Sequence, residues 1–201
     1  MELTRLEQQI RFIVEIDKLK TIRRRTYVID ENRSENTAEH SWHIAVMAMI
    51  LAEYANEKID VTKVVKMALV HDIVEIDAGD TFMYDTVGAL DKAEREQRAA
   101  ERIFNLLPAD QAVEMRALWD EFEARQTAEA RFAAAMDRLT PQLQNFNTNG
   151  GSWKDHAISR ERVIDRNRTM GEGSANLWEF TQRLLDQAVK RGILTKSRDT
   201  A

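Results

Sequence analysis

Apolar residues recur along this chain at intervals of three and four, the spacing that places them on one face of an α-helix. The first such stretch runs from about Leu3 to Ile22. Its apolar positions are Leu6, Ile10, Ile13, Ile16 and Leu19. We find no segment in which apolar and polar residues alternate as they do in a β-strand. The pattern therefore predicts an all-α protein.

Capping signals place the next two helices. The polar stretch from Tyr27 to Glu35 is expected to be a loop, and Asn36 with Glu39 has the spacing of an N-cap pair that opens a second helix, which ends near Asn56. Asp60 is a candidate cap for a third helix, whose apolar stripe runs into His71 and Asp72. Gly79 is its expected end.

Five further helical patterns follow in the second half of the chain. They cover Leu90–Leu107, Ala109–Arg125, Thr127–Phe146, Ser159–Met170 and Ala175–Arg191. Pro141 is expected to kink or interrupt the third of these, and Asn147 to Gly151 is the clearest loop. Because no stretch has the composition of a linker, we expect a single helical bundle over residues 1–201.

Composition limits the possible functions. The 201 residues are 43% hydrophobic, which is enough for one core, and the 29 Lys and Arg against 34 Asp and Glu give a net charge of -5 that disfavours a nucleic-acid polymer as partner. With no cysteine, any metal must be bound by nitrogen and oxygen atoms. Neither a leader at Met1–Arg5 nor an apolar run of about 18 residues is found, so we expect a cytoplasmic protein without a membrane partner.

Two helices carry unusual polar residues among apolar neighbours. His71 and Asp72 follow the apolar run Met67–Val70, and Glu75 lies one helical turn further on, so that all three can face one side. Asp137 lies within the apolar stretch Phe132–Leu139. Since a buried carboxylate without a partner costs free energy, these groups are expected to contact a base or an ion.

Taken singly, each of these residues has an ordinary interpretation. A histidine near an apolar face usually has its hydrogen bonds satisfied within the core, and Asp137 has Arg131 and Arg138 as possible surface partners. Together with His40 on the second helix, however, the chain offers two imidazoles and two carboxylates, a set that suits a hard or borderline divalent cation. His43 is an alternative ligand on spacing alone.

The order of these histidines and carboxylates along the chain, together with the residues Ala38–Ser41 around His40, resembles the HD-domain phosphohydrolases. The resemblance covers about residues 5–185, which would form the catalytic core. It is most similar to their branch of small 5′-deoxynucleotidases. The resemblance implies one divalent metal ion (Mn, Co, Fe, Ni, Mg or Zn) that polarises the phosphate and activates a water molecule. The metal ligands that it implies are His40, His71, Asp72 and Asp137. It favours His40 over His43, which is left with a supporting or packing role.

The resemblance also implies roles for residues outside the ligand set. Glu75 and Asp80 would act near the water and the leaving oxygen, although a solvated helix end is the alternative for both. Arg24, in the basic run Arg23–Arg25, would contact the substrate phosphate. Arg25 stands where the best-known bacterial pattern has a tryptophan near the sugar, so sugar discrimination is open.

The resulting hypothesis is hydrolysis of a nucleoside 5′-monophosphate, first of all a deoxynucleotide, to nucleoside and phosphate. One alternative is another HD hydrolase that acts on a nucleotide di- or triphosphate, a cyclic nucleotide or an alarmone. A second alternative is a non-catalytic helical module with a structural metal. The resemblance further implies a homodimer, and neither the base preference nor the physiological metal follows from the sequence.

Overall fold

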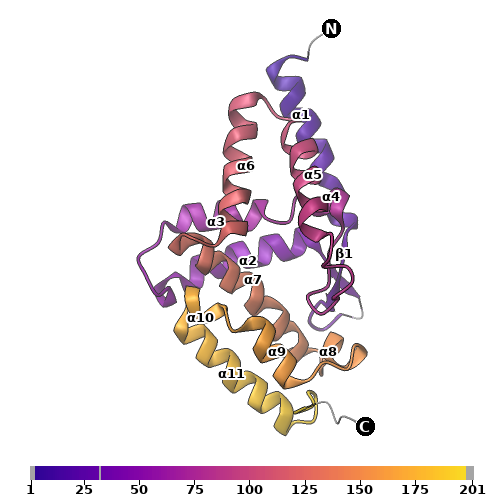
Figure 1. The fold of residues 1–201 in the computed structure, drawn as a ribbon, viewed down its shortest axis with the longest axis vertical. Helices are drawn as coiled ribbons and strands as arrows, with labels where there is room; N and C mark the ends of the chain where they lie inside the picture. The colour runs from indigo at the N-terminus through magenta and orange to yellow at the C-terminus, as the bar shows by residue number, and fades with distance from the viewer. Residues whose placement is uncertain (1–2, 32, 198–201) are drawn as a thin grey trace.

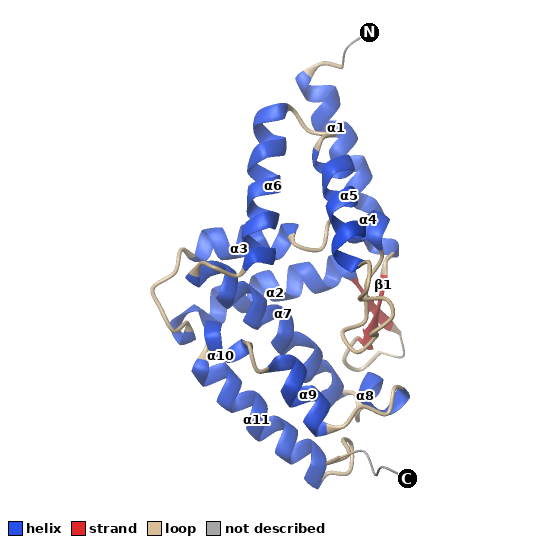
Figure 2. Ribbon diagram, in the orientation of Figure 1, coloured by secondary structure: helices blue, strands red, loops and turns tan. Residues whose placement is uncertain are grey.

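The computed structural model describes residues 3–31 and 33–197; the ends of the expected domain, 1–2 and 198–201, lie outside this part. The molecule is elongated, with α1, α5 and α6 at one end and α8, α9 and α11 at the other (Figure 1). Helices form nearly all of the regular structure (Figure 2), which confirms the all-α prediction apart from one small sheet.

The element boundaries are as follows. The α-helices are α1 (Arg5–Ile16), α2 (Thr37–Leu51), α3 (Val61–Val70), α4 (Glu75–Ala78), α5 (Lys92–Phe104), α6 (Ala109–Ala124), α7 (Ala128–Asn147), α8 (Gly151–Asp155), α9 (Arg160–Asn167), α10 (Met170–Gly173) and α11 (Ala175–Lys190). Two 3₁₀ helices, η1 (Asp17–Thr21) and η2 (Ala52–Tyr54), and two strands, β1 (Arg23–Tyr27) and β2 (Ser34–Asn36), complete the fold.

Helix α7 is the centre of the core. It packs against α2, α3, α6, α10 and α11, and its side chains Phe132, Met136 and Leu139 are almost fully buried. The alanines at positions 133, 134 and 135 are buried too, which lets neighbouring helices approach the backbone closely. A smaller cluster around Trp153 and Leu185 joins α8, α9 and α11. Asp137 thus lies on the most enclosed helix of the protein.

The predicted caps are present. Asn36 accepts a hydrogen bond from the Glu39 amide while the Glu39 carboxylate accepts one from the Asn36 amide, a complete capping box at the start of α2. Asp60 accepts from the backbone at Thr62 and Lys63. Gly79, expected to end the third helix, instead ends the short helix α4, with a φ of 75° that favours glycine.

The sequence pattern did not reveal the two short strands. β1 and β2 form an antiparallel pair at the two ends of the expected loop Tyr27–Glu35, with Arg23 opposite Asn36 and Tyr27 opposite Ser34. The strands are short, and β1 begins with three consecutive arginines, so the two-residue periodicity that identifies a strand is not readable. Asn32, which was part of the expected loop, lies outside the described residues.

Three helix boundaries also differ from the prediction. The third helix stops at Val70, so His71 and Asp72 lie in a turn before α4 rather than on one continuous helix. Helix α7 contains Pro141 and continues to Asn147 without the interruption that we considered. The expected loop is limited to residues 148–150, because α8 begins at Gly151.

Only part of the apolar stripe predicted for the first helix is buried within this chain. Leu19 is buried on η1, whereas Leu6, Ile10 and Ile13 on α1 are each at least half exposed. The spacing thus predicted a helix over Leu3–Ile22, which the structure divides into α1 and the 3₁₀ helix η1, and it did not reveal whether the apolar face is covered by this chain.

Among the described helices, none is both long and apolar enough to cross a bilayer.

Candidate metal centre

Three separate elements bring the four expected ligands together. His40 comes from α2, His71 and Asp72 from the turn after α3, and Asp137 from the middle of α7. His40 Nε2 lies 3.0 Å from Asp137 Oδ1, and His71 Nε2 lies 3.1 Å from Asp72 Oδ1. One nitrogen or oxygen of each of His40, His71 and Asp72 falls within 4.8 Å of the others, which is the spacing of groups that can share an ion.

The two imidazoles are oriented by their other ring nitrogens. His71 Nδ1 lies 2.9 Å from the carbonyl oxygen of Ala68, which can only accept, so Nδ1 carries the hydrogen. In the neutral ring the lone pair is therefore on Nε2, a buried atom without a hydrogen bond that faces Asp72 and Asp137. His40 Nδ1 lies 3.3 Å from a carboxylate oxygen of Glu35, so Nε2 is likewise directed at the cluster.

Opposite charges hold the two aspartates ionised. Burial by itself would raise the pKa of Asp72, but His71 and Arg24 outweigh it and hold that pKa well below its usual range. The pKa of Asp137 is also lowered, because its hydrogen bond with His40 and the charges of His40, His71 and Arg24 outweigh burial. Both side chains are thus available as anionic oxygen ligands.

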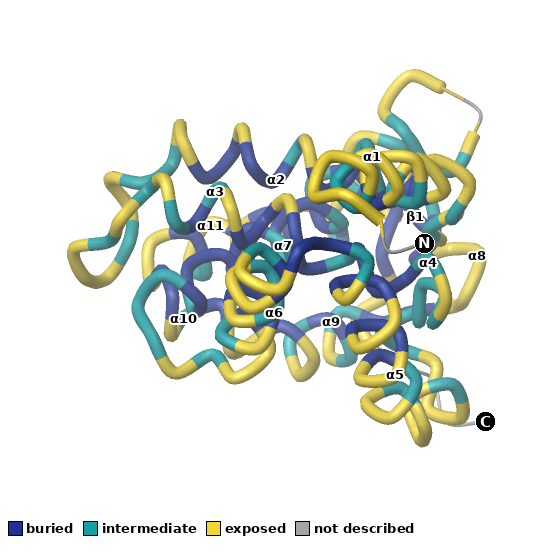
Figure 3. The backbone as a smooth tube through the Cα atoms, turned by 90° about the horizontal axis from the view of Figure 1, so that it is seen from above, coloured by how far each residue is buried: buried dark blue, intermediate teal, exposed yellow. Residues whose placement is uncertain are grey.

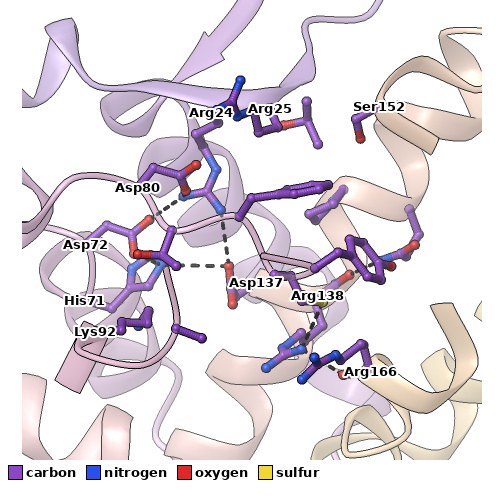
Figure 4. Close-up of a pocket in the computed structure, with 18 of the residues that line it drawn as sticks. Arg24, Arg25, His71, Asp72, Asp80, Lys92, Asp137, Arg138, Ser152 and Arg166 are labelled. Atoms are coloured by element: carbon purple, nitrogen blue, oxygen red, sulfur yellow. Dashed lines mark hydrogen bonds and ion pairs between the residues drawn. The ribbon is translucent and has the colours of Figure 1, made fainter. Parts of the chain in front are cut away.

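Arg24 reaches the same cluster from β1. Its Nη1 atom lies 2.8 Å from Asp72 Oδ2 and 3.5 Å from Asp80 Oδ1 (Figure 4), and its side chain is only 13% exposed. Burial would lower the pKa of this guanidinium, but the surrounding carboxylates more than compensate and raise it. The residue expected to bind phosphate therefore points into the carboxylate cluster.

Glu75 and Asp80 stand beside the ligand cluster. Glu75 is 5% exposed and accepts a hydrogen bond of 2.9 Å from Thr37 Oγ1, while Asp80 follows Gly79 on the loop after α4. Burial and the negative charge of Asp72 raise the pKa of Glu75 well above its ordinary value. Burial also raises the pKa of Asp80, although Arg24 opposes the shift. Neither residue is the solvated helix end that we considered as the alternative.

A cavity of about 530 Å³ opens from this cluster, and its volume is in the range of small-molecule sites. Glu75, Asp80 and Asp137 line one end of it, and Phe82, Tyr84 and Trp153 contribute aromatic surface. Arg138 and Arg166 lie on the far side of Asp137 from Asp80 (Figure 4). Arg25 also lines the cavity from an exposed position on β1.

Sequence reasoning missed Glu35. It is 3% exposed, faces His40 Nδ1, and accepts a hydrogen bond of 2.6 Å from Gln144. A carboxylate behind a histidine orients the ring and increases its basicity. Glu35 lay inside the expected loop, so its burial became visible only once β2 was placed; its position one residue before the Asn36 cap was the available signal.

The other two histidines lie outside the group of candidate ligands. The ring of His43 stacks on Trp42 at 6.1 Å, which agrees with a packing role and not with the alternative of a ligand. His156 follows α8, and its ring lies 4.6 Å from that of Phe82.

The donor set fits a divalent cation. The buried Nε2 of His71 has no hydrogen-bond partner, and the cluster supplies imidazole nitrogen with anionic oxygen, which is a combination that Mn²⁺, Fe²⁺, Co²⁺, Ni²⁺ and Zn²⁺ accept. Metal binding requires neutral imidazole. The carboxylates raise the pKa values of His40 and His71 against the effect of burial, so an ion would compete with protons for these rings.

Comparison with known proteins gives one family and close structural neighbours. A family model described as an HD domain matches residues 16–178. The human protein named 5′-deoxynucleotidase HDDC2 is 32% identical over 136 residues, which are 67% of this chain and 65% of that protein, so the chain spans about two thirds of that relative.

Among solved structures, one described as a predicted metal-dependent phosphohydrolase from Magnetospirillum magnetotacticum MS-1 is 55% identical, with a TM-score of 0.91 over 95% of this chain and 96% of that one. A conserved hypothetical protein from Pyrococcus furiosus, 22% identical, has the same fold with a TM-score of 0.61 over 90% of this chain and 99% of that one.

Proposed function

The chain belongs to the HD-domain phosphohydrolase family, and from that premise we propose that it hydrolyses nucleoside 5′-monophosphates, above all deoxynucleotides, to nucleoside and phosphate. The observation that carries this proposal is the cluster of two imidazoles and two carboxylates at one end of a cavity large enough for a nucleotide. The curated relatives named 5′-deoxynucleotidase support the choice of substrate.

His40, His71, Asp72 and Asp137 are the proposed ligands of one divalent ion. When bound, such an ion polarises the phosphate and lowers the pKa of water near it. The protein contributes the fixed direction of the ligands, through Ala68 behind His71 and Glu35 behind His40. The support behind His71 is a backbone carbonyl, so Glu35 is the one of the two that a substitution removes, and replacing it is expected to weaken metal binding without removing a ligand.

The remaining polar groups supply proton transfer and phosphate binding. Glu75, which is buried beside the ligand cluster and within 3.9 Å of Arg24, accepts the proton of the attacking water. Asp80, which lines the cavity on the loop after α4, gives a proton to the leaving 5′-oxygen when the bond from phosphorus to that oxygen breaks. Arg24 has five N–H donors in a planar group and binds the phosphate oxygens beside Asp72.

A phosphate-release screen tests the proposed function directly. Purified protein would be treated with a chelator, reloaded with each of six divalent metals, and assayed with ribo- and deoxyribonucleoside monophosphates. Release of phosphate from monophosphates by at least one metal form is the expected result. Activity confined to diphosphates, triphosphates, cyclic nucleotides or alarmones would instead indicate the alternative HD activity, and no turnover of any nucleotide would indicate a structural metal.

We also propose that the protein is a homodimer. Large apolar side chains are exposed on α1 (Leu6, Ile13 and Val14) and on α2 (Trp42 and Ile50), and they support this proposal because an apolar surface patch often marks the site of a protein partner. Helices α1 and α2 lie along the same side of the molecule in Figure 3. Light scattering coupled to gel filtration is expected to give twice the 23.2 kDa mass of the chain, and Ile13→Glu is expected to give the monomer.

A further inference from the structure

The end of the cavity beyond Asp137 is rich in arginine. Arg125 follows α6, Arg138 lies on α7, and Arg166 and Arg168 lie at the end of α9; all four line the same cavity as the candidate metal ligands. These residues are not part of the proposed metal and proton-transfer machinery. They come from three different segments of the chain, so the concentration of positive charge is a product of the fold.

Arg138 is the most enclosed member of this group. Its Nη1 atom donates to the backbone carbonyl of Arg166 at 2.8 Å and contacts Met83 Sδ at 3.2 Å, while its Nε atom is buried without a hydrogen-bond partner. The buried Nε of Arg125 also lacks a partner. Within residues 3–31 and 33–197, no carboxylate oxygen lies within 4.0 Å of a side-chain nitrogen of these arginines, although Asp165 and Glu123 also line the cavity.

Like charges face one another here. Burial lowers the pKa of Arg138, and the positive charges of Arg125 and Arg166 lower it further, although the Asp137 carboxylate opposes the shift. The hydroxyl of Tyr84, which lines the same region, is buried without a hydrogen-bond partner. Guanidinium groups that have no carboxylate within 4.0 Å among the described residues, beside a hydroxyl without a hydrogen-bond partner, form a site whose missing complement is an oxyanion.

We propose that Arg138 and Arg166, with Arg125, Arg168 and the Tyr84 hydroxyl, bind a second phosphate group of the substrate, so that the preferred substrate class is nucleoside bisphosphates. This inference rests on the proposed function, because it assumes that the first phosphate is the one hydrolysed at the metal cluster. Water attacks that phosphorus, the bond to the 5′-oxygen breaks, the oxygen takes up a proton, and the second phosphate remains on the product.

A neutral nucleoside does not satisfy this end of the cavity equally well. A nucleobase presents carbonyl and ring-nitrogen acceptors, which pair with one guanidinium but leave the net positive charge of the group uncompensated. A phosphate dianion accepts from several donors at once and neutralises charge. The second phosphate is assigned to the substrate rather than to a free ion, because the arginine-rich end and the end with the candidate metal ligands belong to one cavity.

The test compares 2′-deoxyadenosine 5′-monophosphate with 2′-deoxyadenosine 3′,5′-bisphosphate. Phosphate release and calorimetric binding would be measured for wild type, Arg166→Ala and Arg138→Gln in the metal-loaded protein. Arg166→Ala removes the cation but keeps the backbone carbonyl that Arg138 uses. Arg183→Ala is the matched control, because Arg183 is an exposed arginine of α11 that pairs with Glu179 and does not line the cavity.

Wild type and the control are expected to prefer the bisphosphate in kcat/KM by roughly 10- to 100-fold, the scale of one charge-assisted hydrogen bond. Arg166→Ala and Arg138→Gln are expected to bring this ratio close to one. A wild-type ratio near one, or a ratio unaffected by both variants, would overturn the proposal. Binding of inorganic phosphate that depends on Arg166, without a preference for the bisphosphate, would also overturn it, since the anion would then be a free ion.

The binding measurements distinguish failure of the second phosphate site from failure of the proposed function. If neither nucleotide is hydrolysed, the 5′-nucleotidase proposal fails, and the calorimetric comparison still decides the second phosphate site. Tighter binding of the bisphosphate to wild type than to Arg166→Ala supports the site, and equal binding of the two nucleotides to wild type refutes it.

Discussion

Arg24 Nη1 lies 2.8 Å from Asp72 Oδ2, so one carboxylate serves both the guanidinium and the proposed metal. Glu75 and Asp137 also lie within 4.0 Å of the same guanidinium. Arg24 is therefore the counter-charge of the ligand cluster in metal-free protein, and it competes with an ion for Asp72.

Replacing Arg24 is expected to destabilise the metal-free protein. Arg24→Ala leaves buried carboxylates unpaired, and the loss of one partner from a buried ion pair costs about 3 kcal/mol. The melting temperature of chelator-treated Arg24→Ala should fall by several degrees, and the dissociation constant for Mn²⁺ should decrease because the competitor is gone. Arg23→Ala, an exposed neighbour on β1, is the control. Equal stability of Arg24→Ala and wild type after chelation would contradict this reading of the cluster.

Arg24 is also expected to act on the substrate phosphate. Arg24→Ala should lower kcat/KM by about 2–4 kcal/mol in transition-state terms, which is the scale for a positioned electrostatic donor. Arg24→Lys should recover only part of the loss, because an ammonium group cannot make the bidentate contact. Steady-state kinetics at saturating metal would measure both, and full recovery by lysine would argue against a planar contact.

Removal of the metal is expected to abolish activity and to lower stability. An ion that binds only the folded protein stabilises it by about 2.7 kcal/mol at a hundred times its dissociation constant. Asp137→Ala should lose metal and turnover together, as measured by elemental analysis and phosphate release. Asp186→Ala, which removes an exposed aspartate that pairs with Arg160, should keep both. Normal metal content in Asp137→Ala would remove Asp137 from the ligand set.

Glu75→Gln is expected to separate catalysis from metal binding. The amide cannot exchange a proton, so turnover should fall by roughly 100-fold or more at nearly normal metal content. The folded protein raises the pKa of Glu75 above its unfolded value, so this residue favours folding below about pH 4.5 and loses that contribution as the pH rises through the folded pKa. At pH 7, metal-free Glu75→Gln should therefore unfold at a higher temperature than wild type. Unchanged turnover would exclude Glu75 from proton transfer.

Arg25 is expected to affect sugar selectivity. It is exposed at the edge of the cavity and can move toward solvent, whereas an aromatic wall cannot yield to a 2′-hydroxyl. Wild type should discriminate weakly between matched ribo- and deoxyribonucleotides, and Arg25→Trp should increase the preference for the deoxy form. The ratio of the two kcat/KM values measures this. If wild type strongly prefers deoxyribonucleotides and Arg25→Trp does not change that preference, residues other than the one at position 25 exclude the 2′-hydroxyl.

The sequence by itself determined the helices and their caps. Helical periodicity and the Asn36–Glu39 pair act over three or four residues, so their signals survive without any tertiary contact. The polar residues within apolar runs, His71 and Asp137 among them, were also visible, because burial of an ionisable group is unfavourable wherever it occurs. The sequence did not show which groups each of these residues contacts.

Only the tertiary structure decided the surroundings of these residues. His40 meets Asp137 across 97 positions of the chain, and Arg24 meets Asp72 across 48, distances over which no local pattern carries information. The burial of Glu35, the exposed stripe of α1 and the gathering of Arg138 with Arg166 likewise depend on which helix faces which. The packing of whole apolar faces determines which helices are neighbours. The surroundings of each polar side chain then follow from the position of its helix.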